Sequence, residues 1–217
     1  MSSREDILGR IRANLGRNAA NATTDRAALD AYLQARPQGP RPRIGGDLAT
    51  RFREKSELLS STVEEVAVSQ AAPQVIARYL ATHRLAPHAV CWPELAELPW
   101  HEAGMQVEVR AATGSDLVGI TGCFCAVAET GTLMLCSGPD TPATTSLLPE
   151  THIAIVSAAR ILPGMEEAWN LARAELGEMP RAVNFISGPS RTGDIEQTIV
   201  LGAHGPYRVH IVIVRGA

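Results

Sequence analysis

From residue 47 onward, short apolar runs alternate with segments that carry the apolar spacing of a helix, and this alternation constrains the fold more than any other feature. The apolar runs are predicted strands, at Thr62–Val68, His88–Trp92, Met105–Arg110, Leu117–Thr121, Ile153–Val156, Val183–Ile186 and Arg208–Val214. The predicted helices are Asp47–Ser60, Pro73–Thr82, Glu166–Leu176 and Arg191–Leu201. Strands that alternate with helices favour a mostly parallel sheet with both faces covered. The predicted fold class is therefore α/β, with a mostly parallel sheet flanked by helices.

A hairpin is expected within this pattern. Cys125–Ala128 and Thr132–Cys136 are both strand-like, and only Glu129, Thr130 and Gly131 lie between them. A short connection that contains glycine, set between two strand-like runs, is typical of a β-hairpin.

The first 46 residues have a different pattern. Ser3–Leu15 and Thr24–Ala35 are predicted helices, and Pro37–Gly46 holds three prolines and three glycines, which is typical of a linker. We therefore divide the chain into a helical arm with its linker (residues 1–46) and an α/β domain (residues 47–217). The arm can dock onto a partner or a second subunit, or fold back onto its own domain, and the sequence leaves both open.

Composition excludes several classes of function. The net charge is −3 and aromatic residues make up 4% of the chain, so neither a nucleic-acid surface nor a base-stacking platform is expected. No apolar stretch approaches the roughly 18–20 residues that cross a membrane, and the N-terminus lacks the apolar segment of a signal peptide. We expect a cytoplasmic protein. Its basic residues are all arginine except Lys55, a pattern typical of GC-rich coding sequence.

The four cysteines, Cys91, Cys123, Cys125 and Cys136, form no C-x-x-C pair. Neither a structural zinc site nor an iron–sulfur cluster is therefore expected in this chain. Cys123 and Cys125 form a C-x-C, whose thiols in a strand would face one side as small apolar groups. The sequence also lacks paired metal-binding histidines, a G-x-G-x-x-G fingerprint and a P-loop. We expect no bound metal and no bound nucleotide cofactor.

Glycine-rich polar turns at strand ends carry the candidate ligand-binding residues, because glycine lets backbone amides approach a ligand closely. These candidates are Thr130, Gly131, Thr132, Ser137, Gly138, Ser190, Arg191, Thr192, Asp194, Glu196 and His204. The class of ligand that they suggest is a small substrate or an anion.

One of these turns, with the sequence GPSRTGDIEQ, suggests the anion most directly. Ser190 or Thr192 is expected to cap the helix that begins there, and Arg191 adds a full positive charge to the amides of the helix start. This combination suits a phosphate or a carboxylate. The alternative is structural: the hydroxyls only cap the helix, and Arg191 pairs with Asp194 or Glu196.

Glu129 is the candidate for proton transfer or nucleophilic attack. It follows an apolar run, where loss of solvation makes a carboxylate a better proton acceptor, and a glutamate can also attack an acyl group. The alternative is a solvated hairpin glutamate. His204 is either a ligand-binding group or a turn residue, and His152 is expected to be a buried histidine at the start of a strand.

Three strings in one order resemble the signature of the LUD domain family. They are GITGCFCAVAETGTLMLCSGP, SLLPETHIAIV and ISGPSRTGDIEQTIVLGAHGP, and the resemblance extends from about Asp47 to the C-terminus. It is strongest to the lactate-utilisation protein C branch, where a helical N-terminal extension is also usual. The matching polar positions are Glu129, Thr130, Thr132, Ser190, Arg191, Thr192, Asp194, Glu196 and His204.

The resemblance implies the α/β sandwich of coenzyme-A transferases, ribose-5-phosphate isomerase and formyltetrahydrofolate cyclo-ligase. It also implies an accessory or substrate-handling role beside two iron–sulfur partner proteins, with the clusters in those partners, in the oxidation of L-lactate to pyruvate. Two alternatives stay open: a free-standing acyl-transfer or isomerase-type enzyme that uses Glu129, and a regulatory module that binds a small anion. Whether the chain is itself an enzyme, and whether it forms a homo-oligomer, also stay open.

Overall fold

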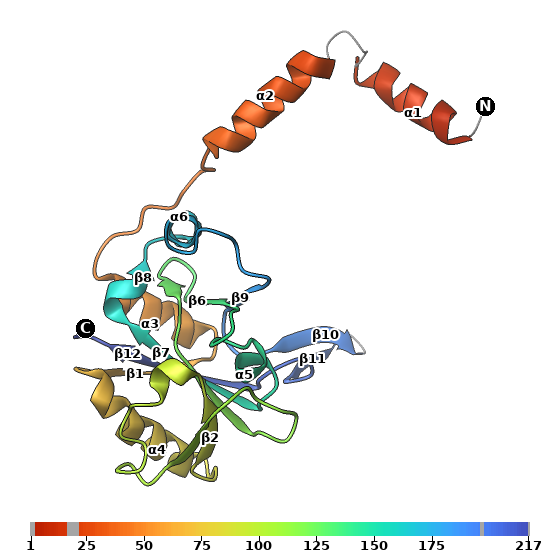
Figure 1. Ribbon diagram of the computed structural model, residues 1–217. Helices are drawn as coiled ribbons and strands as arrows, with labels where there is room; N and C mark the ends of the chain where they lie inside the picture. Colours follow the sequence, from red (N-terminus) through yellow and green to blue (C-terminus); the bar gives the residue numbers. More distant parts are fainter. Residues whose placement is uncertain (1–2, 17–21, 196–197, 217) are drawn as a thin grey trace. The chain divides into compact units, whose positions relative to one another are not determined.

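The computed structural model describes residues 3–16, 22–195 and 198–216 (Figure 1). The chain falls into two compact units, Met1–Arg43 and Ile44–Ala217.

The first unit contains two helices, α1 (Ser3–Asn14) and α2 (Ala22–Ala35), close to the two helices predicted for the arm. Large apolar side chains on both helices are exposed, among them Ile7, Tyr32 and Leu33. In the described ranges, no helix of either unit is both long enough and apolar enough to cross a membrane.

The second unit is built on a six-stranded sheet in which every neighbouring pair is parallel, in the order β1-β12-β7-β4-β2-β3. Its strands are β1 (Thr62–Val66), β2 (His88–Cys91), β3 (Gln106–Val109), β4 (Val118–Thr121), β7 (Thr151–Ser157) and β12 (Arg208–Val214). β7 and β12 are buried along almost their whole length, as expected for parallel strands covered on both faces. The predicted α/β class with a mostly parallel sheet is confirmed.

One face of this sheet is covered by helix α4 (Ala72–Thr82). Pro73 lies in the first turn of this helix, where the missing N–H of proline removes no helical hydrogen bond. Ile76 and Leu80 belong to the same buried cluster as Ile120 of β4. The spacing of four residues puts both side chains on the helix face that meets the sheet.

The opposite face is covered by helix α3 (Leu48–Leu58) and a second sheet. This sheet has the order β8-β5-β6-β9, and its strands are β5 (Cys125–Val127), β6 (Thr132–Cys136), β8 (Ile161–Leu162) and β9 (Val183–Ile186). Phe52 of α3, Leu133 of β6 and Ile211 of β12 lie in one buried cluster. β5 and β6 pair antiparallel, which confirms the predicted hairpin.

Helix α6 (Met165–Glu175) packs on the far side of the second sheet. Ala168 and Ala172 of this helix contact a cluster that contains Cys125 and Met134. The hairpin strands are therefore buried on both faces. The remaining short helices are η1 (Ser69–Ala71), η2 (Pro93–Leu95), α5 (Thr144–Leu147) and η3 (Ala158–Arg160).

The helix predicted at Arg191–Leu201 is wrong. The chain instead forms two antiparallel strands, β10 (Arg191–Ile195) and β11 (Thr198–Leu201), with Arg191 opposite Leu201. This segment has five β-branched residues among its eleven and a glycine at position 193. β-Branched residues lose side-chain freedom in a helix and glycine is a poor helix former, so strand pairing prevails.

Candidate functional site

The parallel strands of the six-stranded sheet start at one edge, here named the amino edge, and end at the other, the carboxyl edge. Helix α3 runs antiparallel to these strands, so it begins near the carboxyl edge and ends near the amino edge. Its N-cap residue Asp47 accepts a hydrogen bond from Arg215, which follows β12 at the carboxyl edge (3.1 Å). Leu59 and Ser60, which follow α3, lie just before β1 at the amino edge. The predicted site residues that the structure describes lie at both edges.

The β5–β6 turn packs against α3. Gly131 adopts a left-handed φ of +67°, and a Cβ atom at this position would lie 2.5 Å from the backbone nitrogen of Ser56. The Ser56 hydroxyl donates to the Gly131 carbonyl (3.3 Å). Glu129, in the same turn, is half-buried and its N–H donates to the Pro163 carbonyl (3.0 Å). Only glycine fits where the turn meets the helix. This contact fixes the backbone of the turn, and with it the position of Glu129.

Three hydroxyl groups form a chain beside this turn. Thr130 Oγ1 lies 2.7 Å from Thr132 Oγ1, which in turn lies 2.7 Å from Ser187 Oγ. Thr132 begins β6 and Ser187 follows β9, and the two strands are paired. Two of the predicted residues, Thr130 and Thr132, therefore lie in one hydrogen-bonded group at the amino edge.

Arg191 lies at the same edge. Its exposed guanidinium donates through Nη2 to the Leu59 carbonyl (3.1 Å) and to the Ser60 hydroxyl (2.6 Å). It forms no ion pair with any acidic residue in the ranges that the structure describes. The helix N-terminus expected at the anion site is therefore absent, because the segment forms strand β10, but the positive charge of Arg191 is present. The alternative pairing cannot be described, because the side chain of Asp194 and the whole of Glu196 lie outside the described residues.

The loop after β11 is tied to Ser190. The N–H of Ser190 donates to the Pro206 carbonyl (2.8 Å), and the N–H of Gly202 donates to the Ser190 carbonyl (3.0 Å). This places the exposed His204 on a loop that adjoins Arg191. Thr192, which was also predicted to bind a ligand, is buried.

Lys55 also lies in this region, although it was not among the predicted site residues. It is half-buried on α3, and its Cβ atom is among the nearest neighbours of Gly131. Like Arg191, it pairs with no acidic side chain in the described part of the chain. The one available signal was that it is the only lysine in the chain.

Ser137 and Gly138 lie elsewhere. The five residue steps of β6 from Thr132 to Ser137 cover about 16 Å at roughly 3.3 Å per residue, which takes the chain to the carboxyl edge. There the Ser137 hydroxyl accepts a hydrogen bond from the Ala182 N–H (2.9 Å). The predicted ligand-binding set is therefore divided between two places.

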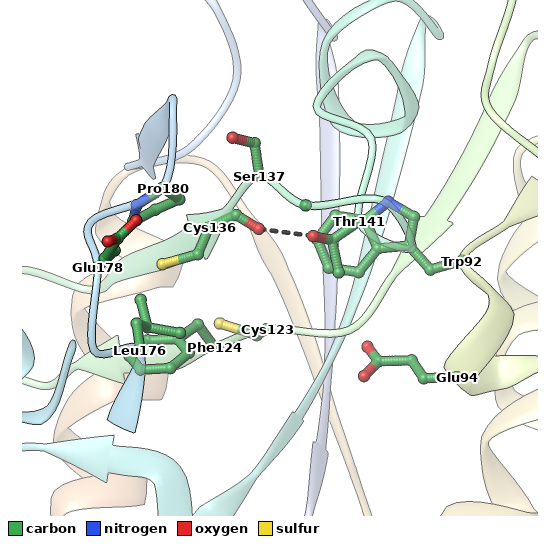
Figure 2. A pocket seen from close by; sticks show the side chains of 11 residues that line it. Trp92, Glu94, Cys123, Phe124, Cys136, Ser137, Thr141, Leu176, Glu178 and Pro180 are labelled. Carbon is green, nitrogen blue, oxygen red and sulfur yellow. Dashed lines mark hydrogen bonds between the residues drawn. The ribbon is translucent and has the colours of Figure 1, made fainter. Parts of the chain in front are cut away.

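Ser137 lines a pocket of about 400 Å³ at the carboxyl edge (Figure 2). The pocket lies beside residues that follow β2 and β4, namely Trp92, Glu94 and Cys123, and beside Cys136, which ends β6. Ligands of parallel α/β sheets commonly bind beyond the carboxyl ends of strands. Neither Trp92 nor Glu94 was predicted as a site residue, although Trp92 ends the predicted strand His88–Trp92 and Glu94 lies two positions after it, which was a usable signal.

Glu94 lies on the Trp92 side of this pocket, with its carboxyl group turned toward Cys123 (Figure 2). A Cβ atom at Gly122 would lie 1.6 Å from Glu94 Oε1, so the carboxylate rests directly on the Gly122 backbone. Burial raises the pKa of Glu94, and a hydrogen bond from the Gly122 backbone partly opposes this effect. The carboxyl group is therefore somewhat harder to ionise than a free one, although the Glu94 side chain as a whole is exposed.

His152 is buried, as expected, and its Nε2 lies 2.8 Å from Thr121 Oγ1. Burial lowers the pKa of His152 to about 4, so the ring is neutral at physiological pH. Among the described residues, no group of three or more histidine, cysteine or acidic side chains is arranged to hold a metal ion.

A model of the LUD domain family matches residues 14–214. The chain is 39% identical over 118 residues to lactate utilization protein C 1 of Bacillus mycoides (strain KBAB4), covering 53% of this chain and 50% of that protein. It is 40% identical over 100 residues to lactate utilization protein C of Bacillus subtilis (strain 168), covering 45% and 42%. The chain spans about half the length of the curated relatives that it matches.

A crystal structure of a DUF162 family protein from Deinococcus radiodurans is similar in fold. The TM-score is 0.60 at 25% sequence identity, over 80% of this chain and 99% of that one. The family match covers most of the sequence, including nearly all of the α/β unit. The chain belongs to the LUD domain family.

Proposed function

We propose that this chain is the substrate-handling component of a system that oxidises L-lactate to pyruvate. Membership of the LUD domain family and the names of its curated relatives support the lactate role. The structural observation that carries the proposal is the group of cations and hydroxyls at the amino edge, here named the α3-end site. It comprises Lys55, Ser60, Thr130, Thr132, Ser187, Ser190 and Arg191.

Lactate presents a carboxylate beside a hydroxyl group, and the α3-end site offers matching partners. Both hydrogen bonds that Arg191 donates to described residues come from Nη2. Its Nε and Nη1 groups donate to no described residue. A guanidinium binds a carboxylate in a bidentate manner, and serine or threonine hydroxyls can serve the substrate hydroxyl. Lys55, on α3, supplies a second positive charge.

Oxidation of lactate to pyruvate removes two electrons and two protons. The sequence carries no cluster-type cysteine spacing and no dinucleotide fingerprint, which supports an electron acceptor in other chains. In this proposal two iron–sulfur partner proteins take the electrons, and the present chain binds and orients the carboxylate.

The test is lactate-dependent reduction of a dye by the system purified from its own host. We expect Arg191→Ala to lower the rate at least about tenfold, since it removes charge-assisted hydrogen bonds to the substrate. Arg191→Lys should restore part of the rate because it returns the charge without the fork. Arg173→Ala, an exposed arginine on α6, is the matched control and should leave the rate unchanged. Unaltered turnover by Arg191→Ala would refute this assignment.

A free-standing acyl-transfer or isomerase-type enzyme is the second candidate. The half-buried Glu129 favours it, because its carboxylate has no hydrogen-bond partner in the described part of the chain and is therefore not committed to a structural role. This candidate requires the purified chain alone to act on acyl-coenzyme A or sugar phosphates, and Glu129→Gln to abolish that activity. A regulatory module for a small anion would instead bind its ligand with Glu129→Gln and show no turnover.

A further inference from the structure

We infer that the pocket at the carboxyl edge is a second binding site, specific for an organic cation: an ammonium group carried on a small apolar body. This inference does not depend on the lactate role. It rests on the charges that line the pocket, on its walls and on its size.

The charged side chains that line the pocket are all acidic in the described part of the chain. Glu94 and Glu178 both line the pocket, and no lysine, arginine or histidine is among its described lining residues. The guanidinium of Arg160 lies over the ring of Phe124 (4.8 Å to its centroid), donates to the Phe124 carbonyl (2.8 Å) and pairs with Glu175 (2.8 Å), so its charge is already matched. An anion in the pocket would meet two carboxylates with no compensating charge, which is unfavourable in a partly desolvated space.

The Glu94 carboxyl is placed to accept such a cation. It points toward Cys123 across the pocket, and no described cation forms an ion pair with it (Figure 2). Burial of the carboxyl group raises the pKa of Glu94, although the side chain as a whole is exposed. An ammonium group that binds there would restore the lost stabilisation of the ionised form through a charge-assisted hydrogen bond.

The thiols add no competing charge. Burial raises the pKa of both Cys123 and Cys136, so both are neutral at physiological pH. Cys123 donates its S–H to the Cys125 carbonyl (2.8 Å), which leaves it committed to the backbone. Both cysteines line the pocket and contribute neutral, polarisable walls.

The apolar walls and the volume of the pocket indicate the size and shape of the apolar part of the ligand. Phe124, Leu176 and Pro180 lie on one side of the pocket, opposite Trp92 (Figure 2). The Trp92 indole N–H donates to the Pro142 carbonyl (3.1 Å), which fixes the ring in place. A volume of about 400 Å³ falls within the range of small-molecule sites and far exceeds what the six heavy atoms of lactate fill. A ring or a branched chain suits these walls.

Three probes of nearly one shape and different charge test the inference: benzylamine, benzyl alcohol and benzoate. Binding is followed by NMR titration of the Trp92 indole N–H signal in the ¹⁵N-labelled full chain, with the signal assigned by Trp92→Phe. We expect benzylamine to bind at least about tenfold more tightly than benzoate, with benzyl alcohol in between. Equal binding of all three, tighter binding of benzoate, or no shift with any probe at millimolar concentration would each overturn the inference.

Two variants separate the charge of Glu94 from its position. Glu94→Gln removes the charge and should reduce benzylamine binding to the level of benzyl alcohol. Gly122→Ala keeps the charge but puts a methyl group where Oε1 now lies, so it should displace the carboxylate and have a similar effect. Glu54→Gln, an exposed glutamate on α3, is the control and should change nothing. If Glu94→Gln keeps the preference for benzylamine, the inference is wrong.

Discussion

At the scale of single residues, two buried histidines make the stability of the fold depend on pH. His152 lies beside Thr121, and His210 is stacked on the ring of Tyr79 with centroids 4.0 Å apart. Each ring has one nitrogen that is buried without a hydrogen-bond partner, Nδ1 of His152 and Nε2 of His210. Burial is the main cause that lowers the pKa of both histidines to about 4, well below their ordinary value of 6.5.

These histidines predict acid destabilisation in a defined window. Between about pH 6.5 and pH 4 the unfolded chain binds protons that the folded chain does not, so the free energy of unfolding falls as the pH falls. Each histidine should contribute about 3 kcal/mol over the full window, at 1.36 kcal/mol per pKa unit. Urea denaturation at pH 7.5, 6.0 and 5.0 measures this loss, and His152→Asn should reduce it. A free energy of unfolding that stays constant across these three pH values would contradict the assignment.

At the scale of elements, the junction between the β5–β6 turn and α3 holds the α3-end site in place. We expect Gly131→Ala to destabilise the protein by at least about 2 kcal/mol, because alanine disfavours the positive φ and its Cβ would strike the backbone at Ser56. Gly114→Ala is the control, since nothing lies within 4 Å of its new Cβ, and it should cost about 0.5 kcal/mol or less. Equal urea midpoints of unfolding for the two variants would show that the Gly131–Ser56 contact does not exclude a side chain.

The same elements show how far sequence reasoning reaches. Apolar runs predicted the strands of the parallel sheet, and the short glycine turn predicted the β5–β6 hairpin, because both signals are local. The separate layer of the second sheet was not predicted, since the two-residue strand β8 carries no pattern and its pairing with β5 is non-local. At β10 and β11 the helix was predicted from a possible N-cap residue. The β-branched composition of the segment was the better signal, and the predicted helix was wrong.

The candidate site was only partly predictable for a related reason. Thr130, Thr132 and Arg191 were selected from their turns, but their common neighbour is the end of α3, which lies more than 70 positions before Thr130 in the sequence. Sequence alone also grouped Ser137 with them, although β6 carries it to the opposite edge. The edge at which each turn lies depends on strand direction in the second sheet, and no local pattern gives that direction.

At the scale of the whole α/β unit, the two edges of the parallel sheet differ in charge. The amino edge has Lys55 and Arg191 beside several hydroxyl groups, and the carboxyl edge has a pocket with Glu94 and Glu178. Opposite charges at the two edges would direct an anion to one and a cation to the other. We therefore expect lactate to bind at the α3-end site and not in the pocket.

The most direct test is an NMR titration of the ¹⁵N-labelled protein with L-lactate, followed residue by residue. We expect saturable shifts at the amides of Gly131, Ser187 and Ser190, with the signals of Trp92 and Cys123 unchanged. Arg191→Ala should abolish those shifts. Shifts at Trp92 and Cys123 with none at the α3-end site would place lactate in the pocket and refute the proposed binding site.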